Sequence, residues 1–183
     1  MNPLKKIYLE KVLPDLKKEA GLKNDLSVPM LKKITVSVAD GDFQQNKDLL
    51  SKTKDWLTLI TGQKPKVNEA RKSVAGFNIR EKDIIGLSVT LRGNRMYSFL
   101  HKLINAVLPQ VKDFQGLSLT SFDGLGNYNF GLTEQIVFPE VDYDKISKVA
   151  SLGINIETSA KTDEMAKSLL VKLGLPFVKE AKN

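Results

Sequence analysis

The chain has 183 residues, of which 42% are hydrophobic, and a formal net charge of +7, so it is long and apolar enough to bury a core and intrinsic disorder is not expected. Its apolar runs are far shorter than the roughly 20 residues that cross a bilayer, and we expect neither membrane insertion nor a signal peptide. The absence of cysteine excludes disulfides, thiolate zinc sites and thiol catalysis together.

Hydrophobic periodicity divides the first part of the chain into helix, strand and helix. Apolar residues at helical spacing open the chain, and Pro14 is expected to kink or restart that helix before Gly21 closes it. The next segment alternates apolar and polar side chains, as a half-buried strand does. The predicted elements are the opening helix over residues 4–20, a strand over 33–38, a turn over 39–42 and an amphipathic helix over 46–60.

The rest of the chain mixes short strands, turns and helices. The predicted elements are a weak strand over 66–71, a loop over 72–82 centred on Gly76, a strand over 84–91, a helix over 96–107 that Pro109 stops, strands and turns over 110–138 whose last strand covers 133–138, a short helix over 143–150, a strand over 154–158 and a helix over 162–173. No regular strand–helix–strand rhythm appears. We therefore expect an α+β fold, a single domain over residues 1–183 in which helices pack on one face of a mostly antiparallel sheet and a basic loop protrudes.

The positive charge is concentrated in residues 64–112. This stretch holds ten basic side chains against three acidic ones and has a net charge of +7, while the rest of the chain is neutral. The basic residues are Lys64, Lys66, Arg71, Lys72, Arg80, Lys82, Arg92, Arg95, Lys102 and Lys112. A polyanion is the natural partner of such a block, because each neutralised phosphate releases condensed counterions.

Inside this stretch, residues 71–80 combine basic and small side chains. Arg71, Lys72 and Arg80 lie on the flanks, with Ser73, Ala75 and Gly76 between them. Small residues let the backbone approach a partner closely, while Arg and Lys contact phosphates. Phe77, in the middle, is suited either to stack on a base or to anchor the loop in the core. A solvated charged face without a partner is the simpler alternative.

Three other features suggest catalysis or ligand binding more weakly. Gly124-Leu125-Gly126 hints at a phosphate-cradling loop, but its spacing is not that of a nucleotide-binding motif, and turn glycines explain it better. His101 is the single histidine, so no histidine cluster can form around it.

The third feature is a crowding of carboxylates in one turn, Glu140, Asp142 and Asp144. Paired acids suit acid–base catalysis or a hard cation, although a helix N-terminus explains them more simply. These features leave a small nucleotide-using enzyme as one alternative to nucleic-acid binding. A protein–protein adaptor whose basic face is incidental is the second alternative.

Several long motifs follow one another along the chain. They are Gly62-Gln63-Lys64-Pro65, Ala70-Arg71-Lys72-Ser73-Val74-Ala75-Gly76-Phe77, Val89-Thr90-Leu91-Arg92-Gly93, Ser121-Phe122-Asp123-Gly124 and Phe138-Pro139-Glu140. In these motifs, and over almost its whole length, the chain resembles the bacterial-type large-subunit ribosomal protein L-five family.

The resemblance implies a structural role in translation, without catalysis, cofactor or metal, in a cytoplasmic or organellar ribosome. The implied partners are 5S rRNA and 23S rRNA in the central protuberance of the large subunit, the P-site tRNA, neighbouring central-protuberance proteins, and a small-subunit head protein of the S-thirteen family. The resemblance carries 5S rRNA binding onto Ser37, Gln63, Thr90 and Arg92. It carries tRNA contact onto the loop, at Arg71, Lys72, Ser73, Gly76, Phe77 and Arg80.

Some positions depart from the family pattern. Ser37 and Ala39 stand where an asparagine and a glycine are usual, Gln115 replaces an arginine, and Leu125 replaces the arginine of a Gly-Arg-Gly turn. Asp40 and Asp42 add negative charge near the expected RNA surface. We expect these changes to alter individual RNA contacts and to leave the family assignment intact.

Overall fold

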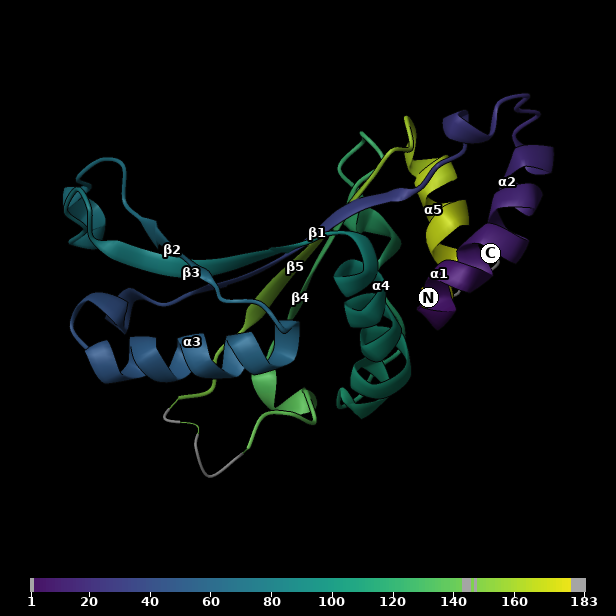
Figure 1. The fold of residues 1–183 in the computed structure, drawn as a ribbon. Helices are drawn as coiled ribbons and strands as arrows, with labels where there is room; N and C mark the ends of the chain where they lie inside the picture. The colour runs from purple at the N-terminus through teal and green to yellow at the C-terminus, as the bar shows by residue number, and fades with distance from the viewer. Residues whose placement is uncertain (1, 143–145, 147, 179–183) are drawn as a thin grey trace. The chain divides into compact units, whose positions relative to one another are not determined.

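The computed structural model describes residues 2–142, 146 and 148–178 (Figure 1). Its α-helices are α1 (Pro3–Ile7), α2 (Leu13–Glu19), α3 (Lys47–Thr61), α4 (Gly93–Lys102) and α5 (Asp163–Lys172). Its strands are β1 (Leu31–Ala39), β2 (Lys66–Glu69), β3 (Ile84–Leu91), β4 (Tyr128–Leu132) and β5 (Leu152–Thr158). None of the described helices is long and apolar enough to cross a membrane.

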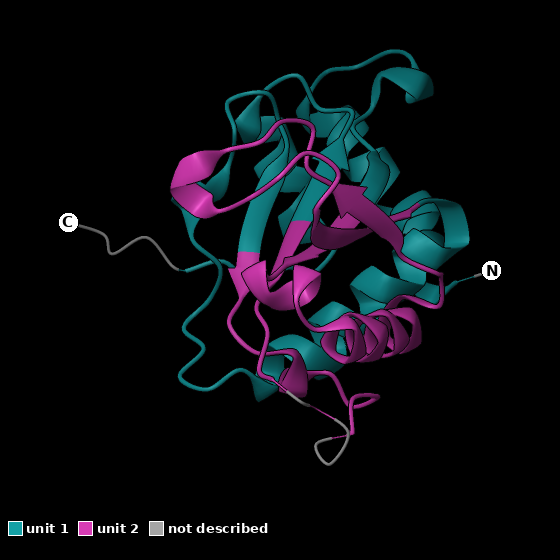
Figure 2. Cartoon of the chain, turned by 90° about the vertical axis from the view of Figure 1, so that its left-hand side faces the viewer, with its two compact units in different colours: residues 1–34, 92–130, 155–183 teal, residues 35–91, 131–154 magenta. Residues whose placement is uncertain are grey.

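The chain divides into two compact units, coloured separately in Figure 2. Unit 1 comprises residues 1–34, 92–130 and 155–183, and unit 2 comprises residues 35–91 and 131–154. Strands β1, β4 and β5 therefore contribute residues to both units, whereas α3, β2, β3 and the basic loop belong to unit 2 alone.

The strands form one five-stranded sheet in the order β2-β3-β1-β5-β4. Strands β2 and β3 are antiparallel, with Lys66 opposite Ser88. Strands β1 and β5 are antiparallel too, because Ser37 meets Gly153 near one end of β1 and Lys33 meets Glu157 towards the other. The expected α+β fold with a mostly antiparallel sheet is confirmed.

Helix α3 packs against the sheet in unit 2 and lies along one face of it (Figure 1). Asn46 caps its N-terminus by accepting a hydrogen bond from the Leu49 N–H, and Gly62 ends it with a left-handed backbone conformation. Its buried side chains are Leu49, Leu50, Thr53, Trp56, Leu57, Ile60 and Thr61. This apolar stripe covers the buried side of β3, so the opposite side of that strand is the one open to a partner.

In unit 1, both helices that approach a proline widen into a π-helix just before it. Residues 8–12 precede Pro14 in this form, and residues 103–107 precede Pro109. Proline lacks an N–H and its ring crowds the carbonyl four residues earlier, so the regular hydrogen-bond pattern cannot continue. At Pro14, where a kink or restart was expected, the π-helical stretch passes into α2 with right-handed helical backbone throughout, and Gly21 follows that helix with φ of 61°.

Two sequence-based expectations need correction. No strand covers residues 133–138: β4 ends at Leu132, and residues 135–137 form a 3₁₀-helix closed by a hydrogen bond from the Phe138 N–H to the Gln135 carbonyl, which turns the backbone away from the extended conformation of a strand. The helix expected over 143–150 lies partly outside the described residues, at 143–145 and 147, and the described residues 146 and 148–150 are not helical.

Candidate nucleic-acid interface

The open face of the sheet in unit 2 is built from small polar side chains. Along β3, the apolar residues Leu87, Val89 and Leu91 are buried, whereas Ser88 and Thr90 between them are partly exposed. Strand β1 follows the same alternation, with Thr35 and Ser37 on its less buried side. Because side chains alternate between the faces of a strand, each strand presents one polar row.

Gly86 and Ala39 show that the two polar rows share one face. A Cβ at Gly86 would lie 3.6 Å from the Cβ of Ala39 and 2.8 Å from the Val38 carbonyl oxygen. Gly86 lies on the same face of β3 as Ser88 and Thr90, and Ala39 lies on the same face of β1 as Ser37. Ser37 and Thr90 therefore belong to a common surface, which we call the polar face: Thr35, Ser37, Lys66, Asn68, Gly86, Ser88 and Thr90.

Hydrogen bonds within this surface orient its polar groups. The Ser88 hydroxyl donates to Oδ1 of Asn68 across the β2–β3 pair at 3.2 Å. The Ser37 hydroxyl donates to the Gly153 carbonyl at 3.4 Å, and a Cβ at Gly153 would lie only 2.9 Å from that hydroxyl. Because these positions carry small side chains or a glycine, no bulky group projects from this part of the sheet. A sugar–phosphate backbone can therefore approach the strands closely.

Gln63 directly follows α3 and lies beside the C-terminal end of β3. Its Nε2 donates to the Thr90 carbonyl at 3.3 Å, so the amide is fixed by the backbone of the strand that carries Thr90. Arg92 is exposed and lies just beyond the end of β3, in unit 1. Of the four residues assigned to 5S rRNA, the fold thus brings Ser37, Gln63 and Thr90 together in unit 2.

The basic loop is an ordered hairpin closed by its own backbone. Val74 and Ile79 form a bridge with hydrogen bonds of 2.8 and 3.2 Å, residues 75–77 form a 3₁₀ turn, and Asn78 takes a left-handed conformation. At the base, Ala70 and Lys82 are joined by a backbone hydrogen bond of 2.9 Å. The loop can therefore present its side chains in a defined arrangement before a partner binds.

The loop side chains point to solvent. Every residue from 71 to 80 except Ile79 is exposed, and Phe77 at the tip is 77% exposed, so it does not anchor the loop in the core. Asp83 accepts a hydrogen bond from the backbone N–H of Arg80, not from its guanidinium. Within the described residues, Arg71, Lys72 and Arg80 form no ion pair with a neighbouring acid.

The acids after β1, Asp40 and Asp42, are paired. Lys148 lies 2.8 Å from a carboxylate oxygen of each. Burial alone would raise the pKa of Asp40, but hydrogen bonds from Lys148 and from the Asp42 backbone hold that pKa below its ordinary value. The same two carboxylates raise the pKa of Lys148. The periodicity of the chain gives no sign of this pairing, which joins residues more than 100 positions apart.

The Gly124–Gly126 turn already holds a carboxylate of the same chain. The backbone N–H groups of Gly124 and Gly126 donate to the two oxygens of Asp163, at 3.1 and 2.9 Å. Asp123 accepts hydrogen bonds from the Asn127 side chain and backbone, which lower its pKa. The turn is thus an internal structural contact rather than a phosphate-binding loop.

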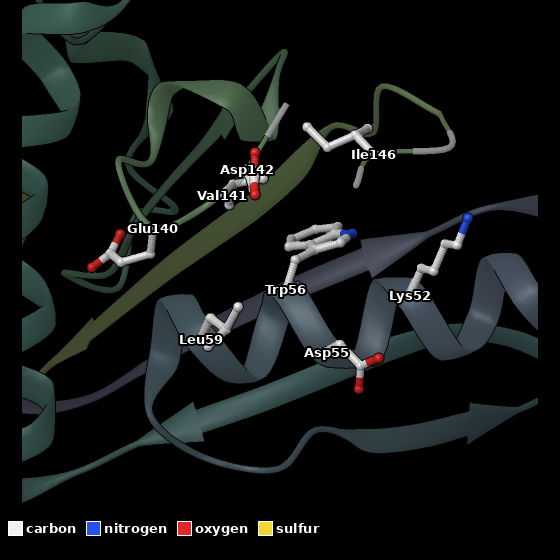
Figure 3. A pocket seen from close by; sticks show the side chains of 8 residues that line it. All are labelled: Lys52, Asp55, Trp56, Leu59, Glu140, Val141, Asp142 and Ile146. Carbon is white, nitrogen blue, oxygen red and sulfur yellow. The ribbon is translucent and has the colours of Figure 1, made fainter. Parts of the chain in front are cut away.

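A cavity of about 440 Å³ lies beside α3 in unit 2 (Figure 3). Its lining includes the apolar side chains of Trp56, Leu59 and Val141, together with Glu140 and Asp142 from the predicted carboxylate turn. Asp144 lies outside the described residues. The described part of the chain contains no group of three or more His, Asp or Glu side chains that is arranged to hold a metal ion.

Comparison with known proteins gives consistent matches over nearly the whole chain. The family described as "Ribosomal protein L5" matches residues 24–80, and the C-terminus of the same ribosomal family matches residues 84–177. The large ribosomal subunit protein uL5 of Dictyoglomus thermophilum is 50% identical, and that of Desulfatibacillum aliphaticivorans 49%, each over 98% of this chain and 100% of that protein. The large ribosomal subunit protein uL5c of Gracilaria tenuistipitata var. liui is 49% identical over 97% of this chain and 99% of that protein.

Proposed function

This chain belongs to the ribosomal protein L5 family, and on that premise we propose that it binds 5S rRNA through the polar face and contacts the P-site tRNA through the loop of residues 71–80. At the level of the family, the chain is a non-enzymatic component of the large ribosomal subunit and is ribosome-associated in the cytoplasm.

The polar face supports the 5S rRNA part of the proposal. Ser37 and Thr90 offer hydroxyls, and Gln63 an amide, on or beside a low surface where 2′-hydroxyls and base edges of a folded RNA can reach them. Lys66 on the same face and Arg92 just beyond β3 supply positive charge for phosphates. Recognition would then depend on the shape of the RNA more than on its linear sequence.

The observation that carries the tRNA part is the exposed, internally closed basic loop. Arg71, Lys72 and Arg80 have no acidic partner among the described residues, so no ion pair must break before they meet phosphates. Phe77 stands exposed among them and is placed to stack on an unpaired base or ribose. Ser73 and Gly76 have small side chains or none, so a partner can approach the loop backbone closely. The Ser73 hydroxyl also accepts a hydrogen bond from the Glu81 N–H.

The remaining partners follow from family membership. We propose contacts with 23S rRNA, with other proteins of the central protuberance, and with a small-subunit head protein of the S-thirteen family.

Two variants test whether the two surfaces have separate roles. In the loop variant, Arg71, Lys72 and Arg80 are replaced by Ala; in the face variant, Ser37→Ala is combined with Thr90→Val. We expect the loop variant to bind 5S rRNA within about twofold of wild type and to weaken tRNA binding by large subunits that carry it, since it removes phosphate contacts. We expect the face variant to weaken 5S rRNA binding by about tenfold, because buried hydrogen bonds to RNA are lost.

The measurements are filter binding of 5S rRNA by the purified protein and tRNA binding by reconstituted subunits. Loss of 5S rRNA binding in the loop variant, with full binding in the face variant, would reverse the assignment of the two surfaces. Unchanged 5S rRNA binding in both would refute the polar face as the binding site.

A further inference from the structure

The turn after β1 places negative charge beside the polar face. Asp40 directly follows Ala39, which lies on that face opposite Gly86, and Asp42 is two residues further on. Charges act over about 8 Å at physiological salt. Two unpaired carboxylates here would therefore repel the phosphates of an RNA lying on the adjacent strands.

Lys148 reduces this repulsion by direct contact. Its Nζ donates to Oδ1 of Asp40 at 2.9 Å and to Oδ2 of Asp42 at 2.8 Å, and it lies 2.8 Å from Oδ2 of Asp40. The Asp40 side chain is only 13% exposed, and its carboxylate also accepts the Asp42 N–H. One ammonium thus satisfies both acids, and the group has a net charge of −1 instead of −2.

Gln135 holds the backbone from which Lys148 extends. Its side chain is fully buried, its Nε2 donates to the Lys148 carbonyl at 2.8 Å, and its Oε1 accepts the Ala150 N–H at 2.6 Å. Both ends of one amide therefore bind the segment around Lys148. A buried amide with both of its polar atoms used in this way is costly to disturb, which keeps Lys148 within reach of the two acids.

We propose that Lys148 supports RNA binding by charge compensation: it neutralises part of the negative charge of Asp40 and Asp42, so that RNA can lie on the polar face despite those two acids. This role rests on the proposed function. Under this proposal Lys148 increases the affinity for 5S rRNA without touching the RNA itself.

Binding of 5S rRNA over a range of salt concentrations, with a set of charge variants, tests this role. Lys148→Gln should weaken binding about fivefold at low salt, with a smaller effect as salt rises, whereas Lys148→Arg should remain within about twofold of wild type. Asp40→Asn with Asp42→Asn should bind more tightly than wild type, because Lys148 is then uncompensated. Adding both Asn substitutions to Lys148→Gln should restore wild-type binding or better.

Lys18→Gln, at an exposed position of α2, is the matched control for loss of one positive charge and should change binding by less than about twofold. An equal loss in Lys18→Gln and Lys148→Gln, or no recovery in the triple variant, would overturn the proposal. If Lys148→Gln fails a thermal-melting check of folding, the double Asn variant decides alone: binding no tighter than wild type refutes the role. Absence of 5S rRNA binding by the wild type would instead refute the proposed function itself.

Discussion

Gly86 is the residue on which the geometry of the polar face depends most directly. It has no side chain where β3 passes β1, and a Cβ there would lie 2.8 Å from the Val38 carbonyl oxygen. Because that neighbour is backbone rather than the end of a flexible side chain, neither strand can adjust without shifting the sheet. Gly86 is thus required for the close packing of β3 against β1, and its lack of a side chain also leaves the polar face accessible at this point.

Gly86→Ala is expected to destabilise the protein by about 1–3 kcal/mol, because the added methyl group overpacks the β3–β1 contact. Urea unfolding monitored by circular dichroism measures the change. Gly76→Ala is the matched control, since nothing lies within 4 Å of the position of its Cβ, and it should stay within about 0.5 kcal/mol. Equal stability of the two variants would contradict the predicted clash.

Asp40 makes the stability of the protein depend on pH. Its pKa is held below the ordinary value of 3.8 in the folded state. The stabilisation from its ionised form is therefore complete above the unfolded pKa and is lost as the pH falls through the folded pKa. We expect Asp40→Asn to be less stable than wild type by about 1 kcal/mol at pH 7, and the difference to shrink below pH 4. Unfolding at several pH values measures this difference, and a constant gap from pH 7 to pH 2 would contradict it.

At the scale of elements, helix α3 connects packing to the site. Its buried apolar side chains pack against one face of β3. The helix ends at Thr61, and after Gly62 comes Gln63, whose side-chain amide donates a hydrogen bond to the Thr90 carbonyl. Asn46 begins the helix, and a left-handed glycine ends it. The position of Gln63 therefore follows from where the helix stops.

Asn46→Ala should destabilise the protein by about 1 kcal/mol, because the Leu49 N–H at the start of α3 loses its side-chain acceptor. Asn46→Asp keeps an acceptor in the same place, adds a favourable charge at the helix N-terminus and should be at least as stable as wild type. Thermal unfolding compares the three proteins. A loss in Asn46→Asp as large as in Asn46→Ala would show that another contact of Asn46 matters more.

At the scale of the whole molecule, charge is distributed unevenly along the chain. Residues 64–112 carry the entire net charge of +7. Six of the ten basic residues in this stretch, from Lys64 to Lys82, belong to unit 2, and the other four, from Arg92 to Lys112, belong to unit 1. Partner binding should therefore draw on both units, and the expectation of one domain over residues 1–183 stays a prediction.

Affinity for 5S rRNA should fall steeply with salt, by at least about tenfold between 50 and 200 mM monovalent salt, because several phosphate contacts release counterions. Titrations at five salt concentrations give the slope of log affinity against log salt. An unrelated folded RNA should bind with a similar slope and lower affinity. A slope near zero for 5S rRNA would contradict binding through phosphates.

Much of the fold could be predicted from local pattern. Strand β3 covers the predicted residues 84–91, and α3 and α5 lie within one or two residues of their predicted bounds, because alternation, capping residues and terminal glycines are local signals. The strand expected over 133–138 was wrong: residues 135–137 form a 3₁₀-helix, and the buried Gln135 side chain is hydrogen-bonded to the backbone of residues 148 and 150, contacts that no pattern of neighbouring residues shows. Ser88 and Asn68 were missed as members of the polar face, although the alternation of β3 already pointed to Ser88.

The amino-acid order alone determined which segments are helices and strands, where the positive charge is concentrated and to which family the chain belongs, since each of these is written in neighbouring residues. The exposure of Phe77, the binding of Asp163 by the Gly124–Gly126 turn and the pairing of Lys148 with Asp40 and Asp42 could be learned only from the three-dimensional fold. These outcomes depend on contacts between residues far apart in the sequence, which form when buried apolar surface brings the segments together.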